Sequence, residues 1–325
     1  MIFGLKWLAM TETLQQEKKK KKHKQNILTE WLIYIALRVL VLFLYLFDIE
    51  TNLKTACFLG RLLWKHYGRG RKRALDNIRA SFPGQSEQWY IQTCRRSFEH
   101  IAMLAVDMLF TARLVKKSNW RKYSKYINCE QVKWRMQENK GLIMVAAHYG
   151  NFEIMGYLLG LFGFNIYSIA RPLDNRFISR YLYGVRQRAG QKIIDKKGAS
   201  EMMDKLVSQG ATLCFIGDQD AGSKALFVDF FGRKASTYKS IGLLAIMNDI
   251  PIGVGYSRRV GNRFFFEIGI QRLILPQEWK DKRDPLKWVT QEYTKAIEDF
   301  IRQDPSQYWW LHRRWKHRPK DEQQE

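Results

Sequence analysis

The stretch that decides the fold is Gly141–Gly156, "GLIMVAAHYGNFEIMG". Its apolar run, Leu142–Ala147, has the length and composition of a buried strand, and the "HYGN" that follows is rich in turn residues. Asn151 is a natural N-cap, which predicts that a helix begins near Phe152. A buried strand that leads through a short turn into a helix is typical of an α/β architecture.

The same stretch contains a histidine and a glutamate five residues apart, His148 and Glu153. Five residues advance about 500° along a helix, so the two side chains can meet only if the chain turns between them. A neutral imidazole with a carboxylate on its other nitrogen is a general base held in one tautomer. On spacing alone, a general base and a hydrogen-bonded structural histidine both remain open. No serine or cysteine adjoins His148, so direct transfer without an acyl-enzyme is the simpler chemistry.

From Gly141 onward, short β-rich runs alternate with helical segments. This alternation predicts a mixed, mostly parallel sheet flanked by helices, and the carboxyl ends of such strands are where catalytic groups gather. The order of the strands cannot be derived from the pattern. We expect strands at 142–147, 166–170, 211–216, 252–256 and 264–270, and helices near 69–114, 152–162, 175–188, 200–208, 240–248 and 285–302.

The N-terminal part of the chain divides into a polar basic segment, 1–26, and an apolar run, 27–47, which precede one main domain, 48–325. The apolar run is about long enough to span a bilayer, so we predict a membrane-embedded anchor helix. Glu30 and Arg38 interrupt it and lie on one helical stripe with Tyr34. Arg38 is near the middle of the run, which is costly in lipid unless its side chain snorkels or faces protein. A buried helix of a soluble core is the alternative. Basic residues flank both ends, so spanning and dipping into one leaflet both remain open.

The 325 residues include 55 Lys and Arg against 31 Asp and Glu, for a formal net charge of +24. Such a charge predicts attraction to nucleic acid, an anionic membrane surface or an acidic protein. The four cysteines lie far apart in the sequence and no pair has CxxC spacing. They therefore indicate neither a zinc site nor a disulfide framework, and a reducing cytosolic environment is expected.

Several motifs, in order along the chain, resemble one family. "AHYGNFE" resembles the H-x4-D/E motif of the lysophospholipid acyltransferase superfamily and, more narrowly, of the bacterial late acyltransferases of lipid A, the lauroyl/myristoyl type. The resemblance runs from about residue 33 to 319. It includes "RKRALDNIRASFP" at 71–83, "ARPLDN" at 170–175, "RQRAG" at 186–190, "GDQDAG" at 217–222, "FVDFFGRKAST" at 227–237 and "YWWLHRRWKHRP" at 308–319.

The resemblance implies that residues 48–325 are an acyltransferase domain, with His148 as the general base and Glu153 as its partner. The acyl donor would be acyl carrier protein, or acyl-CoA, and the acceptor a phosphorylated lipid A precursor. Because the donor carries its own phosphopantetheine, neither a cofactor nor a metal is expected. The implied location is the cytoplasmic face of a bacterial inner membrane, where the positive charge would meet anionic lipid and an acidic donor.

Three arginines are candidates for binding the phosphates of the substrate. Arg171 precedes Pro172, which favours an extended backbone there, and a guanidinium can bind phosphate bidentately. Arg186 and Arg188 end a predicted helix before Gly190, where they could bind phosphate or complement the helix C-terminus. A surface role for Arg171 is the alternative.

Asp218 and Asp220 follow the apolar strand "ATLCFIG" on either side of Gln219. Two carboxylates could be metal ligands, but no third ligand lies near them in the sequence. The resemblance implies that they orient the substrate and pair with the arginines. It also implies that "FFG" at 230–232 lines an acyl channel, although a core position fits equally well.

Two other functions are alternatives to a lipid A acyltransferase. The same fold could acylate another lipid, such as a lysophospholipid or a glycolipid. A polybasic, non-catalytic protein could instead recruit anionic lipid or nucleic acid. That second alternative gives no reason for the turn between His148 and Glu153 or for Asp218 and Asp220. We therefore predict an O-acyltransferase without a nucleic-acid partner.

Overall fold

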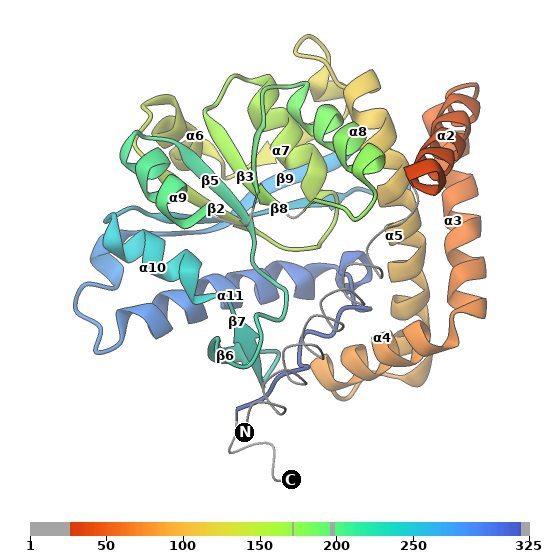
Figure 1. The fold of residues 1–325 in the computed structure, drawn as a ribbon. Helices are drawn as coiled ribbons and strands as arrows, with labels where there is room; N and C mark the ends of the chain where they lie inside the picture. Colours follow the sequence, from red (N-terminus) through yellow and green to blue (C-terminus); the bar gives the residue numbers. More distant parts are fainter. Residues whose placement is uncertain (1–26, 171, 196–198, 320–325) are drawn as a thin grey trace, which may run out of the picture. The chain divides into compact units, whose positions relative to one another are not determined.

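The computed structural model describes residues 27–170, 172–195 and 199–319, so the predicted basic segment 1–26 and Arg171 lie outside the described residues. The described chain forms two compact units. Residues 27–47 and 172–182 belong to the first, and the remaining described residues to the second. Figure 1 shows the helices and strands of both.

The second unit is built on a seven-stranded sheet in the order β1-β9-β8-β2-β5-β3-β4. β2 lies in its interior, paired in parallel with β8 on one side and with β5 on the other. Among the described pairs of this sheet, β8 and β9 alone run antiparallel. The predicted mixed, mostly parallel sheet is confirmed. Its strands are β1 Ser124–Ile127, β2 Leu142–Ala146, β3 Ile166–Ala170, β4 Lys192–Asp195, β5 Thr212–Ile216, β8 Ile252–Arg259 and β9 Phe266–Ile274.

Alternate residues of β2 face two different helical layers, as the period of a strand requires. Ile143 and Val145 join the large core beneath α9, α10 and α11, whereas Leu142 and Met144 join a smaller core beneath α6 and α7. Figure 1 shows α11 crossing one face of the sheet while α6 and α7 cover the other. These helices span α6 Glu130–Gln137, α7 Phe152–Leu161, α9 Ala199–Ser208, α10 Lys239–Met247 and α11 Pro285–Gln303; α8, Arg176–Gln187, follows β3.

Three helices and a hairpin complete the second unit. α3 (Ile49–His66) and α4 (Gly68–Ser81) pack against the long α5 (Glu87–Leu114). β6 (Leu226–Phe230) and β7 (Arg233–Thr237) form an antiparallel hairpin. The predicted acyl-channel residues Phe230 and Phe231 are buried in the large core, so the core alternative describes their position.

The first unit contains α2 (Ile27–Leu44), which is long and apolar enough to cross a membrane by length and composition. Its predicted polar stripe faces protein rather than an apolar surrounding. The Glu30 carboxylate pairs with the Arg176 guanidinium at 2.9 Å. Arg38 donates to the Tyr34 hydroxyl and lies 5.0 Å from the ring centroid of Tyr181. These contacts give the charged residues partners in an otherwise apolar helix.

Candidate functional site

The turn after β2 is held in one conformation by its glycine. Gly150 has φ of +55°, and a Cβ atom built on it would lie 1.8 Å from the carbonyl oxygen of Ser257. No other residue type fits so close to a neighbouring strand. The Asn151 side chain then accepts a hydrogen bond from the backbone N–H of Ile154 at 2.9 Å. The predicted N-cap is therefore confirmed, and α7 begins at Phe152.

Buried side chains of α5 and β8 pack against this turn and hydrogen-bond to it. The ring of His100 donates from Nε2 to the carbonyl oxygen of Gly150 at 3.0 Å. Asn151 donates to the Asp107 carboxylate at 3.1 Å, and Asp107 also forms a buried ion pair with Arg259. Burial lowers the pKa of His100 to about 4 and raises the pKa of Asp107 to about 6. The turn thus has little freedom to move relative to α5.

His148 lies on this turn and pairs with Asp218, which follows β5. Its Nδ1 lies 2.8 Å from one carboxylate oxygen of Asp218, and its backbone N–H donates to the other at 3.1 Å. The imidazole is 15% exposed and the carboxylate 2%. Burial alone would raise the pKa of Asp218, but the charge and hydrogen bonds of His148 and the charge of Arg314 outweigh it, so that pKa is lowered. The carboxylate stays ionised beside the ring.

The second ring nitrogen of His148 points away from the carboxylate. Because Nδ1 donates to an ionised carboxylate, Nε2 of the neutral ring carries a lone pair that can accept a hydrogen bond or a proton. The side-chain amide nitrogen of Gln219 lies 3.3 Å from it. The rings of Phe152 and Trp309 each lie with their centroids 5.1 Å from that of the imidazole. His148 therefore has the geometry of a general base in one tautomer.

Glu153 does not make the predicted contact with His148. Its carboxylate instead receives two hydrogen bonds from the Arg186 guanidinium, at 2.8 and 2.5 Å. Burial acts to lower the pKa of Arg186, but the bond to Glu153 and its charge raise it. The first turn of α7 directs Glu153 toward α8, so the two carboxylates of the site have different partners: Asp218 binds His148, and Glu153 binds Arg186.

Asp220 makes a second histidine–aspartate pair that the sequence pattern did not predict. Nδ1 of His317 lies 2.7 Å from the Asp220 carboxylate, and Nε2 of His312 accepts from the Asp220 backbone N–H at 3.0 Å. Burial lowers the pKa of His312. The aspartates were expected to pair with the arginines, but Arg186 binds Glu153, and Asp218 and Asp220 bind histidines. The repeated histidines in "HRRWKH" were the available signal.

The other two predicted arginines remain without an observed role. Arg171 lies outside the described residues, and Arg188 is exposed just beyond the end of α8. Among the residues that the structure describes, no cluster of three or more His, Cys, Asp or Glu side chains could hold a metal ion.

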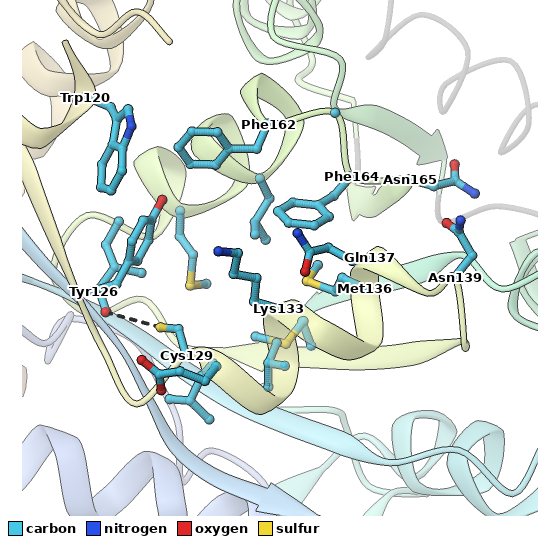
Figure 2. Close-up of a pocket in the computed structure, with 18 of the residues that line it drawn as sticks. Trp120, Tyr126, Cys129, Lys133, Met136, Gln137, Asn139, Phe162, Phe164 and Asn165 are labelled. Carbon is cyan, nitrogen blue, oxygen red and sulfur yellow. Dashed lines mark hydrogen bonds between the residues drawn. The ribbon is translucent and has the colours of Figure 1, made fainter. Parts of the chain in front are cut away.

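A cavity of about 670 Å³ lies elsewhere in the second unit, between α6 and the end of α7. Figure 2 shows aromatic rings, among them Trp120, Phe162 and Phe164, around it, and Lys133 extending from α6 into the space between. Neither His148 nor Asp218 lines this cavity. It therefore does not locate the acid–base groups, which are identified by their hydrogen bonds.

Comparison with known families identifies the family of the chain. The sequence model for "Bacterial lipid A biosynthesis acyltransferase" matches residues 16–317, which is most of the chain and includes every candidate site residue. The chain belongs to this family. It is an acyltransferase of lipid A biosynthesis, as the motifs around His148 indicated.

Individual members of the family are distant and match between 74% and 89% of this chain. A lipid A biosynthesis lauroyltransferase of Escherichia coli (strain K12) is 26% identical over 295 residues, 89% of this chain and 92% of the relative. A palmitoleoyltransferase of the same organism is 25% identical over 296 residues, with the same coverage. A lipid A biosynthesis acyltransferase of Haemophilus influenzae is 24% identical over 245 residues, 74% of each chain.

Proposed function

We propose that this lipid A acyltransferase transfers a fatty acyl chain from acyl carrier protein to a hydroxyl of a lipid A precursor. The reaction would take place at the cytoplasmic face of a bacterial inner membrane. The observation that carries the proposal is the 2.8 Å pair of His148 and Asp218 in a chain of this family. Support for the location comes from the apolar helix Ile27–Leu44.

In the proposed reaction His148 is the general base. Its Nε2 removes the proton of the acceptor hydroxyl while that oxygen attacks the carbonyl carbon of the thioester. The carbon–sulfur bond then breaks, and the imidazolium returns the proton to the departing thiolate. Asp218 holds the ring through Nδ1 and stabilises the positive charge that the ring acquires. An ester and a free thiol are formed, and no other reactant is needed.

Gln219 has a defined place in this scheme. Its amide nitrogen lies 3.3 Å from Nε2 of His148, where the acceptor hydroxyl must bind. The hydroxyl would therefore displace the amide, which would be left to hydrogen-bond the incoming substrate. Such an exchange keeps the lone pair of the base satisfied before the acceptor arrives.

Glu153 and Arg186 are proposed to shape the site rather than to move protons. A guanidinium remains protonated throughout the accessible pH range, so this pair cannot exchange a proton as an imidazole pair can. Because Glu153 occupies the fork of Arg186, phosphate binding is assigned to Arg188 and Arg171 as a proposal. Neither a metal nor a bound cofactor is part of the proposed mechanism.

The donor and acceptor are identified by their chemistry. Acyl carrier protein is acidic and the lipid precursor carries phosphates, and both fit a chain with a net charge of +24. Acyl-CoA is the alternative donor, and a different lipid is the alternative acceptor. Transfer from purified acyl carrier protein thioester and from acyl-CoA, measured side by side, separates the two donors.

The deciding experiment is a mass spectrum of lipid A from cells that lack this protein. We expect lipid A with one fewer acyl chain, and the missing mass gives the chain length. The wild-type chain should restore that chain, whereas His148→Ala, present at the same level in the membrane, should not. Unchanged lipid A in the deleted strain would contradict the proposed acceptor.

A further inference from the structure

An exposed apolar stripe runs along α3, outside the site described above. It consists of Phe58, Leu59, Leu62 and Leu63, whose exposed fractions are 57%, 54%, 38% and 46%. The spacing of three and four residues places all of them on one side of the helix. Large apolar side chains that are contiguous and exposed indicate a surface that contacts a partner.

The opposite side of α3 is buried against α5. Leu53, Ala56 and Cys57 are buried there, and a Cβ atom at Gly60 would lie 2.6 Å from the Cα of Glu99. The two helices are therefore in close contact, and α3 cannot rotate to bury the stripe. α5 in turn carries His100, which is bonded to the turn beside His148. The stripe thus has a fixed position relative to the catalytic residues.

Positive charge lies directly beside the stripe. At about 100° per residue, Lys54, Arg61 and Lys65 form a row along its edge. Arg61 already pairs with the Glu99 carboxylate of α5 at 2.9 Å, so the positive charge that this row offers to lipid phosphates comes from Lys54 and Lys65. The one acidic residue within α3, Glu50, accepts a hydrogen bond from the backbone N–H of Phe264. An apolar face bordered by Lys and Arg is the pattern of a helix that lies in the interface of an anionic membrane.

We propose that α3 is a second membrane-contacting element, which inserts Phe58, Leu59, Leu62 and Leu63 into the surface of an anionic bilayer while the cationic row binds lipid phosphates. This extends the membrane association proposed above from α2 to the acyltransferase domain itself. Through α5, it holds the His148 turn at a fixed height above the lipid that carries the acceptor. The contact does not depend on which lipid is acylated.

The test uses the full-length protein in vesicles of phosphatidylethanolamine and phosphatidylglycerol. A cysteine at Leu59 or Leu62 is labelled with an environment-sensitive fluorophore, and lipids with spin labels on their acyl chains serve as quenchers. A cysteine at Gln131, exposed on α6, is the matched control, and the unsubstituted protein gives the background of its native cysteines. We expect blue-shifted, strongly quenched emission at Leu59 and Leu62 and neither effect at Gln131.

Each other outcome overturns the proposal. Labels at Leu59 and Leu62 that stay unquenched in vesicle-bound protein would show that α3 lies outside the bilayer. A blue shift without quenching would mean that protein, either another segment of this chain or a second copy, covers the stripe.

Replacing both Lys54 and Lys65 by Gln should weaken quenching in anionic but not in neutral vesicles, since each lysine contributes about a fivefold preference for an anionic surface. Equal quenching in both lipids would contradict the role of the cationic row.

The result is separable from the proposed reaction. If α3 fails to insert but lipid A still loses an acyl chain in the deleted strain, the enzyme activity stands and this inference fails. If α3 inserts and lipid A is unchanged, the membrane contact stands and the proposed acceptor fails.

Discussion

Asp218 and Glu153, the two carboxylates near His148, each lie at hydrogen-bond distance from a nitrogen-bearing side chain, but the two side chains differ in kind. Asp218 lies 2.8 Å from an imidazole nitrogen, and Glu153 lies 2.5 and 2.8 Å from the guanidinium of Arg186. An imidazole can accept and release a proton during a reaction, whereas a guanidinium stays protonated. The first pair is suited to proton transfer and the second to holding a shape and a charge.

The two pairs also differ in the secondary-structure elements that supply their residues. Asp218 and His148 follow neighbouring parallel strands, and the register pairs Ala146 with Ile216, two residues before each of them. Glu153 and Arg186 come from the helices α7 and α8. The carboxyl ends of two adjacent interior strands therefore supply the acid–base pair, and the helices beside them supply the ion pair, in keeping with the place of active sites in α/β folds.

The largest expected effect follows from removing the base. His148→Ala should lower acyl transfer by about 10²–10⁴-fold, because general-base assistance is worth that much. The rate is measured with purified enzyme, saturating donor and a lipid A precursor. Thermal melting and vesicle binding should match the wild type. A folded variant that transfers at a near-normal rate would make His148 a structural residue.

Asp218→Asn should be the next most severe change. The amide keeps the shape but removes the charge that stabilises the imidazolium and fixes its tautomer, at a cost on the order of 10²-fold in kcat. Combined with His148→Ala it should add little, because residues that act as one unit are not additive. Multiplied losses in the double variant would show that Asp218 acts independently of His148. Asp229→Asn, at an exposed position of the β6–β7 hairpin, is the control.

A smaller effect separates the two pairs in a double-mutant cycle. Glu153→Gln and Arg186→Gln should each impair the enzyme, since either leaves a largely buried charge without its partner. Their coupling energy, taken from kcat/KM and from melting, should be about 0.5–3 kcal/mol. The cycle between Glu153 and His148 should give a coupling near zero. A large coupling to His148 with none to Arg186 would restore the partnership that the sequence predicted.

Much of the fold could be read from the sequence because its signals are local. The apolar run of β2, the glycine turn and the Asn151 cap each specify their own geometry, and α7 begins where the pattern predicts. β1 and β4 were missed because each has four residues and carries charged side chains at a sheet edge. Such short strands lack the apolar periodicity on which prediction depends.

The partner of His148 could not be read in the same way, because it depends on strand order. Glu153 is near in sequence, but Asp218 is 70 residues away and becomes a neighbour only when β5 lies beside β2. The role of His317 required the position of the C-terminal segment after η3 (Pro305–Gln307), where nothing local indicates a pairing with Asp220. Non-local contacts of this kind follow from topology rather than from pattern.

The smallest expected effect concerns the support beneath the turn rather than the chemistry. His100 is buried and neutral, with a pKa lowered to about 4 from the usual value near 6.5. Below about pH 6.5 the unfolded chain binds a proton that the folded protein resists, so this group makes stability fall as the pH drops toward 4. The difference amounts to about 3 kcal/mol in the free energy of unfolding. Asp107 acts in the opposite direction, because its raised pKa of about 6 makes the folded state the better proton acceptor.

Because His100 and Asp107 act in opposite directions, removing one of them should change how the melting temperature depends on pH rather than abolish activity. In the wild type their contributions largely cancel between pH 6 and 4. His100→Gln can still donate a hydrogen bond to Gly150 but cannot take up a proton, so Asp107 alone remains. Relative to the wild type, the melting temperature of this variant should rise as the pH falls from 7 to 4, while transfer at neutral pH changes little. His66→Gln, at an exposed position on α3, should follow the wild-type curve. If the curves of His100→Gln and the wild type ran parallel, His100 would not be the buried neutral support that links α5 to the catalytic turn.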